Sequence, residues 1–143
     1  MSTSPTFSTQ LIGQTEKTLN AILDRLLVGT GLDEPQWVAL TIAVMAGEPL
    51  ERDALVDRVA GAVKIADTQA QARIDKLTTA GLLGAGSPVG VTEAGRQLHA
   101  RIRSRVVEIT DRMWGDLPPE DLAAAGRVLT TVLERASAEL ARV

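Results

Sequence analysis

The 143-residue sequence has no cysteine, no tyrosine and a single histidine, His99. Without cysteine, disulfide bonds and thiolate metal sites are excluded, and one histidine is too few for a histidine-rich metal centre. Aromatic residues make up only 2% of a chain that is 45% hydrophobic, so the core has to consist of leucine, isoleucine, valine and alanine. Leucine and alanine favour helices, which predicts a mainly α-helical protein. With so few potential ligands, we also expect no metal and no cofactor.

Long hydrophobic runs are also absent, since a membrane span takes about 20 apolar residues. The longest run, Trp37–Ala46, is about half that length and includes Thr41. The polar segment Met1–Ser8 lacks both the basic start and the apolar centre of a signal peptide. We therefore expect a cytoplasmic protein with no membrane partner.

The formal net charge of −3 is not typical of a general nucleic-acid binder, but the charge is unevenly distributed. Residues 49–103 contain eight basic and six acidic residues, a net charge of +2. The rest of the chain contains seven basic and twelve acidic residues, a net charge of −5. The middle of the chain is therefore the part whose charge suits a phosphate backbone, although only mildly.

Apolar residues recur at steps of three and four along most of the chain, which predicts amphipathic helices. The expected helices are 7–28, one from the Asp33 cap to Gly47, 51–63, one from an Asp67 or Thr68 cap to Ala80, 93–114, and a last one after the 116–121 turn. Thr92 is expected to cap the fifth helix, and Gly81 to end the fourth in a left-handed conformation. Met45 is expected on the buried stripe of the second helix, and Ala70, Ile74 and Leu77 on that of the fourth. The apolar stripe of the last helix consists of Leu122, Leu129, Leu133, Ala136 and Leu140.

Two apolar pairs flank a Gly-Ser-Pro turn in Leu82–Thr92, which predicts a short β-hairpin. Three short helices followed by a hairpin are the plan of a winged helix-turn-helix. The long first, fifth and sixth helices carry more apolar surface than one small domain covers, which predicts a symmetric dimer. We expect an N-terminal dimerisation helix in 1–32, a winged helix-turn-helix DNA-binding lobe in 33–92 and C-terminal dimerisation helices in 93–143, interwoven as one domain.

Three segments of the sequence resemble the MarR family of bacterial transcription regulators. They are GLDEPQWVAL at 31–40, RIDKLTTAGLL at 73–83 and VTEAGRQL at 91–98. The resemblance implies a homodimer whose first, fifth and sixth helices interlock and whose two recognition helices enter successive major grooves of double-stranded DNA. It also implies a small phenolic or lipophilic ligand, held between the dimer region and the DNA-binding lobe.

The hairpin and the segment before the fourth helix depart from the family pattern. Family hairpins are longer and carry an Asp and an Arg near the tip, whereas here the tip is Ser87-Pro88. No basic residue lies between Lys76 and Arg96. The segment Val59–Asp67 is about one helical turn longer than usual. We therefore expect binding that is dominated by the major groove and modest in affinity.

The outward face of the fourth helix is the expected DNA-reading surface. Its candidates are Thr68, Gln69, Gln71, Ala72, Arg73 and Lys76. Glutamine can bond adenine bidentately, arginine can bond guanine, and threonine and lysine can take bases or phosphates. The alternative is a polar face that is merely solvated.

Other basic residues are candidate phosphate anchors. They are Lys64, Arg58 and Arg52, together with a group on the fifth helix, Arg96, Arg101, Arg103 and Arg105. The alternative for the first three is surface pairing with Asp53, Asp57 and Asp67. For the arginines of the fifth helix, it is pairing across the dimer or a solvated face.

Trp37 and His99 are the candidate ligand-binding residues. Trp37 lies early in the second helix, where the family's ligand pocket is often lined, and His99 lies beside the core stripe of the fifth helix. The alternatives are packing of Trp37 between helices and a half-buried structural histidine. Trp114, near a helix end, is expected to pack in the dimer region.

Catalysis is not indicated by any motif. Gly84, Gly86 and Gly90 superficially suggest a phosphate loop, but Val89 occupies a position where the dinucleotide fingerprint needs glycine, and no parallel sheet follows. The sequence predicts a DNA-binding regulator rather than an enzyme. The alternative is a dimer of the same fold that binds a ligand or a protein and has weak or no DNA binding.

Overall fold

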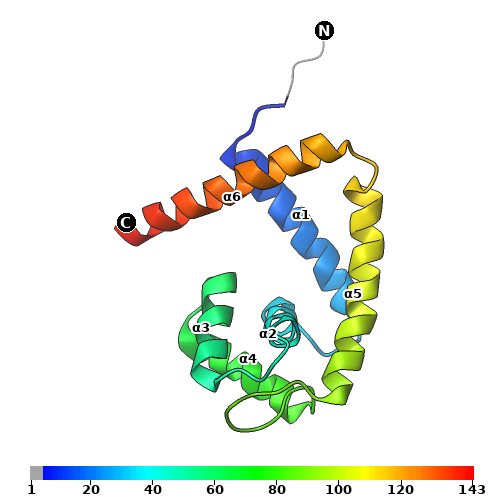
Figure 1. The fold of residues 1–143 in the computed structure, drawn as a ribbon, viewed down its shortest axis with the longest axis vertical. Helices are drawn as coiled ribbons and strands as arrows, with labels where there is room; N and C mark the ends of the chain where they lie inside the picture. The colour runs from blue at the N-terminus through cyan, green and yellow to red at the C-terminus, as the bar shows by residue number, and fades with distance from the viewer. Residues whose placement is uncertain (1–4) are drawn as a thin grey trace. The chain divides into compact units, whose positions relative to one another are not determined.

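The computed structural model describes residues 5–143, so the first four residues of the polar N-terminal segment and of the predicted segment 1–32 lie outside it. Within that range the chain is mainly α-helical (Figure 1). The helices are α1 (Thr9–Leu27), α2 (Glu34–Met45), α3 (Arg52–Val63), α4 (Asp67–Thr79), α5 (Glu93–Trp114) and α6 (Pro119–Arg142). The chain divides into two compact units between Val106 and Val107, inside α5.

Helix starts follow the capping chemistry predicted for α2 and α5. The Asp33 carboxylate accepts from the Gln36 backbone N–H at 2.9 Å, and the Gln36 side chain accepts from the Asp33 N–H at 2.8 Å. This reciprocal pair satisfies two N–H groups that the helix itself leaves without partners. Thr92 Oγ1 accepts from the Gly95 N–H at 3.0 Å, which confirms the predicted cap of α5.

The start of α4 differs from the prediction of an Asp67 or Thr68 cap. Ala66 is the residue before the helix, and its N–H donates to Gln69 Oε1 at 3.1 Å. A glutamine three residues into the helix can bond back to the cap residue even when that residue has no polar side chain. The predicted end is confirmed, because Gly81 follows α4 with a φ of +77°.

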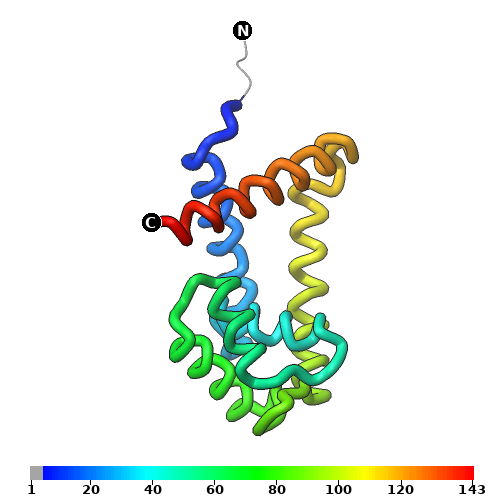
Figure 2. Tube along the Cα trace, turned by 60° about the vertical axis from the view of Figure 1, so that its left-hand side comes forward, coloured from blue at the N-terminus to red at the C-terminus, as the bar shows by residue number. Residues whose placement is uncertain are grey.

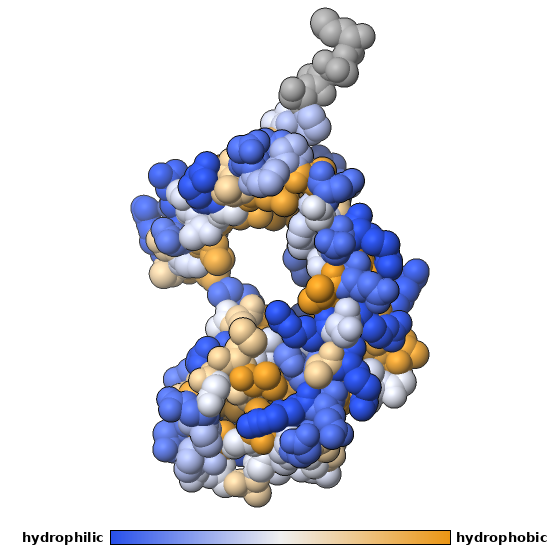
Figure 3. Space-filling model, turned by 45° about the vertical axis from the view of Figure 1, so that its right-hand side comes forward, coloured by the Kyte–Doolittle hydropathy of each residue, from blue (hydrophilic) through white to orange (hydrophobic). Residues whose placement is uncertain are grey.

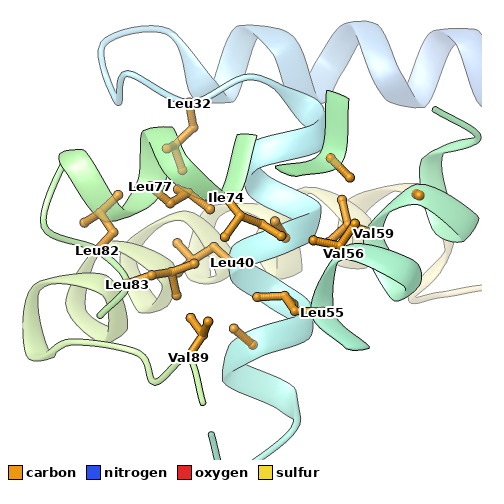
Figure 4. Close-up of a cluster of buried hydrophobic side chains, with 14 of the residues drawn as sticks. Leu32, Leu40, Leu55, Val56, Val59, Ile74, Leu77, Leu82, Leu83 and Val89 are labelled. Carbon is orange, nitrogen blue, oxygen red and sulfur yellow. The ribbon is translucent and has the colours of Figure 1, made fainter. Parts of the chain in front are cut away.

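The core of the first unit lies between α2, α3 and α4, which pack against one another (Figures 1 and 2). Figure 4 shows leucine, isoleucine and valine side chains from these helices and from the hairpin pointing toward one another. The largest fully buried side chains are Leu40, Leu55, Val59, Ile74, Leu77, Leu83 and Val89. Each buried side chain of this size contributes about 1.5–3 kcal/mol, so aliphatic residues alone can stabilise the unit.

The predicted hairpin (the wing, residues 82–92) forms with little regular strand. One antiparallel bridge joins Leu83 to Val91, and a second joins Val89 to Leu50, before α3. Gly84 donates to the Gly90 carbonyl oxygen at 2.8 Å. Glycine and proline interrupt regular strand pairing, which explains why the wing is held by isolated bridges and not by a longer ladder.

Apolar side chains are exposed on the second unit and at the C-terminal end of α2. No residue of α6 is buried, and the predicted stripe of that helix faces outward, with Leu129, Leu133 and Leu140 exposed at 47%, 64% and 58%. The prediction that Met45 is buried is wrong for the single chain, because that side chain, in the last turn of α2, is 65% exposed. Figure 3 shows apolar residues (orange) at the surface among hydrophilic ones (blue). None of the helices in residues 5–143 combines the length and the apolar character that crossing a membrane requires.

Candidate nucleic-acid interface

A three-residue turn, Lys64–Ala66, joins α3 to α4 and makes this helix pair a helix-turn-helix (Figure 2). Lys64 adopts a left-handed conformation, with φ 57° and ψ 50°, and the Ile65 N–H donates to the Ala60 carbonyl oxygen at 3.2 Å. Non-glycine residues seldom adopt this conformation, so the direction of the turn is set by α3 and α4 packing on either side. The Lys64 side chain is exposed beside the start of α4.

The two faces of α4 are chemically distinct. Ala70, Ile74 and Leu77 are completely buried against the core, as their spacing predicted. The opposite face exposes four of the predicted DNA-reading residues, Thr68, Gln69, Ala72 and Lys76. Within residues 5–143, Lys76 takes part in no ion pair, so its charge is available to an outside anion. Gln69 uses Oε1 for the Ala66 N–H, and its amide hydrogens have no acceptor among the residues that the structure describes.

Gln71 is half-buried and hydrogen-bonded within α4. Its Nε2 donates to Asp75 Oδ1 at 3.0 Å, and the same carboxylate oxygen pairs with Arg52 at the start of α3. Arg52, a candidate phosphate anchor, is therefore in a surface ion pair, and its partner is Asp75 and not Asp53, Asp57 or Asp67. Asp75 was missed by the sequence reasoning, although its spacing of four residues from Gln71 on one helix was a usable signal.

Arg73 is drawn away from the exposed face of α4. Its Nε lies 2.9 Å from Asp33 Oδ2, in an ion pair without the alignment of a hydrogen bond, and its side chain is 31% exposed. The pair ties α4 to the N-terminus of α2. Arg73 would have to give up this contact to reach a base.

Carboxylates lie close to the reading face. A hollow of about 540 Å³ between α3 and α4 is lined by Asp53, Val56, Asp57, Asp67, Thr68 and Gln71. Like charges near a phosphate backbone reduce the attraction that lysine and arginine provide. Arg58 is exposed on α3 near these acids and takes part in no ion pair within residues 5–143. In the part of the chain that the structure describes, no three ligating side chains come together to hold a metal ion.

The arginines of α5, Arg96, Arg101, Arg103 and Arg105, are all exposed. Arg101 and Arg105 flank a hollow of about 300 Å³ whose apolar lining includes Leu26, Leu98 and Ile102. Arg96 borders a different hollow, of about 400 Å³, between the end of α2 and the base of the wing. The basic group is thus spread around α5 and does not form one patch with α4.

Trp37 and His99, the predicted ligand residues, lie in contact. Their rings stack with centroids 4.9 Å apart and an interplanar angle of 16°. His99 is 4% exposed, and its Nε2 has no hydrogen-bond partner among the described residues. Burial, and then the charge of Arg103, lowers the pKa of His99 below its ordinary value. At neutral pH the lowered pKa favours the neutral imidazole in this stack. One face of Trp37 is already occupied by the His99 ring.

No protein-family model matches the sequence, and no curated protein matches it either. Solved structures do match. The S. aureus MepR–DNA complex has a TM-score of 0.76 at 15% identity, covering 92% of this chain and 99% of that one.

Two further matches come from other bacteria. The Mycobacterium tuberculosis MarR family protein Rv2887 in complex with DNA has a TM-score of 0.70 at 20% identity, covering 90% and 98% of the two chains. CouR from Rhodococcus jostii RHA1, bound to p-coumaroyl-CoA, has a TM-score of 0.72 at 21% identity, covering 85% and 88%. At this level of identity the likeness concerns the fold, and the chain has the winged helix-turn-helix fold of MarR-family regulators.

Proposed function

We propose that this chain is a MarR-family transcription regulator that binds double-stranded DNA as a homodimer, acts in the cytoplasm and is not an enzyme. The observation that carries the proposal is that α4 of the helix-turn-helix has one polar exposed face and one fully buried face. The exposed face contains Thr68, Gln69, Ala72 and Lys76. Two similar structures, MepR and Rv2887, are complexes with DNA. Gln71 adds to the reading face, Arg73 joins it when its ion pair with Asp33 opens, and Lys64 is the nearest phosphate anchor.

Fluorescence anisotropy against the DNA upstream of the chain's own gene tests this proposal. Binding is expected to weaken with salt, with a slope set by the number of phosphates contacted. The variant Lys76→Ala is expected to weaken binding to all sequences and to reduce the salt slope by about one. No salt-sensitive binding at low ionic strength would refute DNA recognition.

A second candidate function is a dimer of the same fold that binds a ligand or a protein partner and only weakly binds DNA. The uncharged wing and the aspartates between α3 and α4 favour this candidate, because both lower the affinity for phosphate. The same titration separates the two candidates, since a dimer without DNA affinity would give a flat response at every salt concentration.

We further propose that a small phenolic or lipophilic ligand modulates the DNA affinity near Trp37 and His99. CouR, which shares the fold, was crystallised with p-coumaroyl-CoA. Since His99 covers one face of Trp37, the ligand would contact the other face or the ring edge. Titration of p-coumarate into the protein–DNA complex tests this, and release that is lost in Trp37→Ala is the expected result.

A further inference from the structure

The tip of the wing is fastened to the start of α3 by hydrogen bonds. Ser87 Oγ donates to Glu51 Oε2 at 2.6 Å and accepts from the Arg52 backbone N–H at 3.0 Å. Arg52 also reaches the wing with its side chain, since Nη1 lies 3.5 Å from the Gly86 carbonyl oxygen. Arg52 therefore contacts the wing through both its backbone and its guanidinium.

The same guanidinium reaches α4. Nη2 of Arg52 pairs with Asp75 Oδ1, and that oxygen also accepts from Gln71 Nε2 at 3.0 Å. The Arg52 side chain is only 23% exposed, whereas that of Asp75 is 56% exposed. A continuous line of polar contacts thus leads from the wing, through Arg52 and Asp75, to a residue of the predicted reading face.

Asp75 dictates which way the Gln71 amide points. An ionised carboxylate can only accept hydrogen bonds, so it binds the amide NH₂ group and repels the amide oxygen. Gln71 then keeps Oε1 and its second Nε2 hydrogen free. Those are the acceptor and the donor that glutamine uses together to bond the N6 amino group and N7 of adenine.

We infer that Asp75, held by Arg52, is a positioning residue that fixes the Gln71 amide for reading adenine, and that the wing acts on DNA recognition through this pair. The inference rests on the DNA binding proposed above. It gives the short wing a role that needs no basic residue at its tip. A fixed amide also loses less conformational freedom on binding than a mobile one.

The variant Asp75→Asn tests the inference, because an asparagine amide can both donate and accept and so allows Gln71 to turn over. The matched control is Asp57→Asn, which makes the same charge change on the far side of the hollow that Gln71 lines. Each protein is used to select from a pool of randomised DNA duplexes, which is then sequenced. Asp75→Asn is expected to lower the preference for adenine at one position by at least about fivefold, and Asp57→Asn to leave it unchanged.

Two further variants secure the assignment. Gln71→Ala is expected to remove the adenine preference at the same position. If the preference remains, Gln71 does not contact that adenine and the inference is overturned. Arg52→Lys keeps the charge but loses the planar fork that contacts wing and carboxylate together, so it is expected to give part of the Asp75→Asn effect. A measurement that needs no DNA is the NMR chemical shift of the Gln71 side-chain NH₂ group. This chemical shift should change in Asp75→Asn and remain the same in Asp57→Asn.

The outcomes distinguish the inference from the function on which it rests. If the wild-type chain enriches no sequence, DNA recognition fails and the positioning role falls with it. If the wild-type chain enriches a sequence and Asp75→Asn keeps the same base preference, only the positioning role is overturned. An unchanged NH₂ signal in Asp75→Asn would also overturn it.

Discussion

Lys64 combines a backbone role with a charge, and substitution can separate the two. Its left-handed conformation, with φ 57°, costs about 1–2 kcal/mol for a residue with a Cβ atom. Lys64→Gly should therefore raise the free energy of unfolding by up to about 1 kcal/mol, whereas Lys64→Ala should change it little. Both variants remove the same charge, so both should weaken DNA binding alike. Urea denaturation and anisotropy measure the two effects, and a loss of affinity in only one variant would contradict a phosphate-anchoring role.

His99 makes folding stability depend on pH. Because burial and Arg103 lower its pKa in the folded chain below 6.5, the unfolded chain binds the proton more readily. Its contribution to stability is complete above about pH 6.5 and falls as the pH drops toward the folded pKa. His99→Phe, which keeps a ring on Trp37, should flatten the fall of Tm on acidification from pH 6.5. Parallel Tm curves for both proteins would refute this.

Single residues show what the sequence could and could not predict. Ala70, Ile74 and Leu77 were predicted as buried because helical spacing alone places them on one face. The ion pair between Arg73 and Asp33 could not be predicted, since the two residues meet only through the crossing of α4 and α2. Partners of exposed charges depend on tertiary packing, which a local pattern does not contain.

At the level of elements, the start of α5 packs unusually close to the base of the wing. A Cβ atom on Gly95 would overlap the Leu82 carbonyl oxygen and lie 3.0 Å from Val91 Cγ1. Gly95→Ala should therefore destabilise the protein by about 1–3 kcal/mol or more, because backbone would have to move. The control is Gly61→Ala in α3, where nothing lies within 4 Å and alanine should stabilise the helix by about 0.5–1 kcal/mol. Urea denaturation of both variants checks the opposite signs.

The wing offers a second prediction at this scale, because its tip carries no charge. Ala85 is exposed beside the tip, so Ala85→Arg adds a cation without disturbing the core. If the wing faces DNA, this variant should bind more tightly and its salt slope should steepen by about one. Ala85→Gln, of similar length and neutral, is the control. Equal affinity for both variants would mean that the tip lies away from the DNA.

Elements were predicted well where periodicity is strong and less well where it is weak. The helices were predicted because apolar spacing extends over several turns, and Asp33 and Thr92 marked two of their starts. The bridge between Leu50 and Val89 was not predicted, because it joins two short segments with no strand pattern. The missing polar cap at Ala66 was likewise invisible, since the contact from Gln69 replaces it.

At the scale of the whole molecule, the chain alone leaves α6 without a buried residue. Its apolar stripe, from Leu122 to Leu140, recurs at steps of three, four and seven residues, as in helices that bury one face. Large apolar patches on soluble proteins mark interaction surfaces, and a second copy of the chain supplies a matching one. We therefore expect the isolated chain to be a dimer in solution.

Leu133→Glu tests this expectation, because Leu133 is 64% exposed on the apolar stripe of α6. A carboxylate buried in an apolar interface loses its hydration without gaining a partner, so the dissociation constant of the dimer should rise by about tenfold or more. Thr131→Glu adds the same charge on the opposite side of the helix and should leave the dimer intact. Light scattering after size-exclusion chromatography measures the mass. Since a symmetric operator needs two recognition helices at once, Leu133→Glu should also weaken DNA binding, whereas a monomer with full affinity would separate DNA recognition from dimerisation.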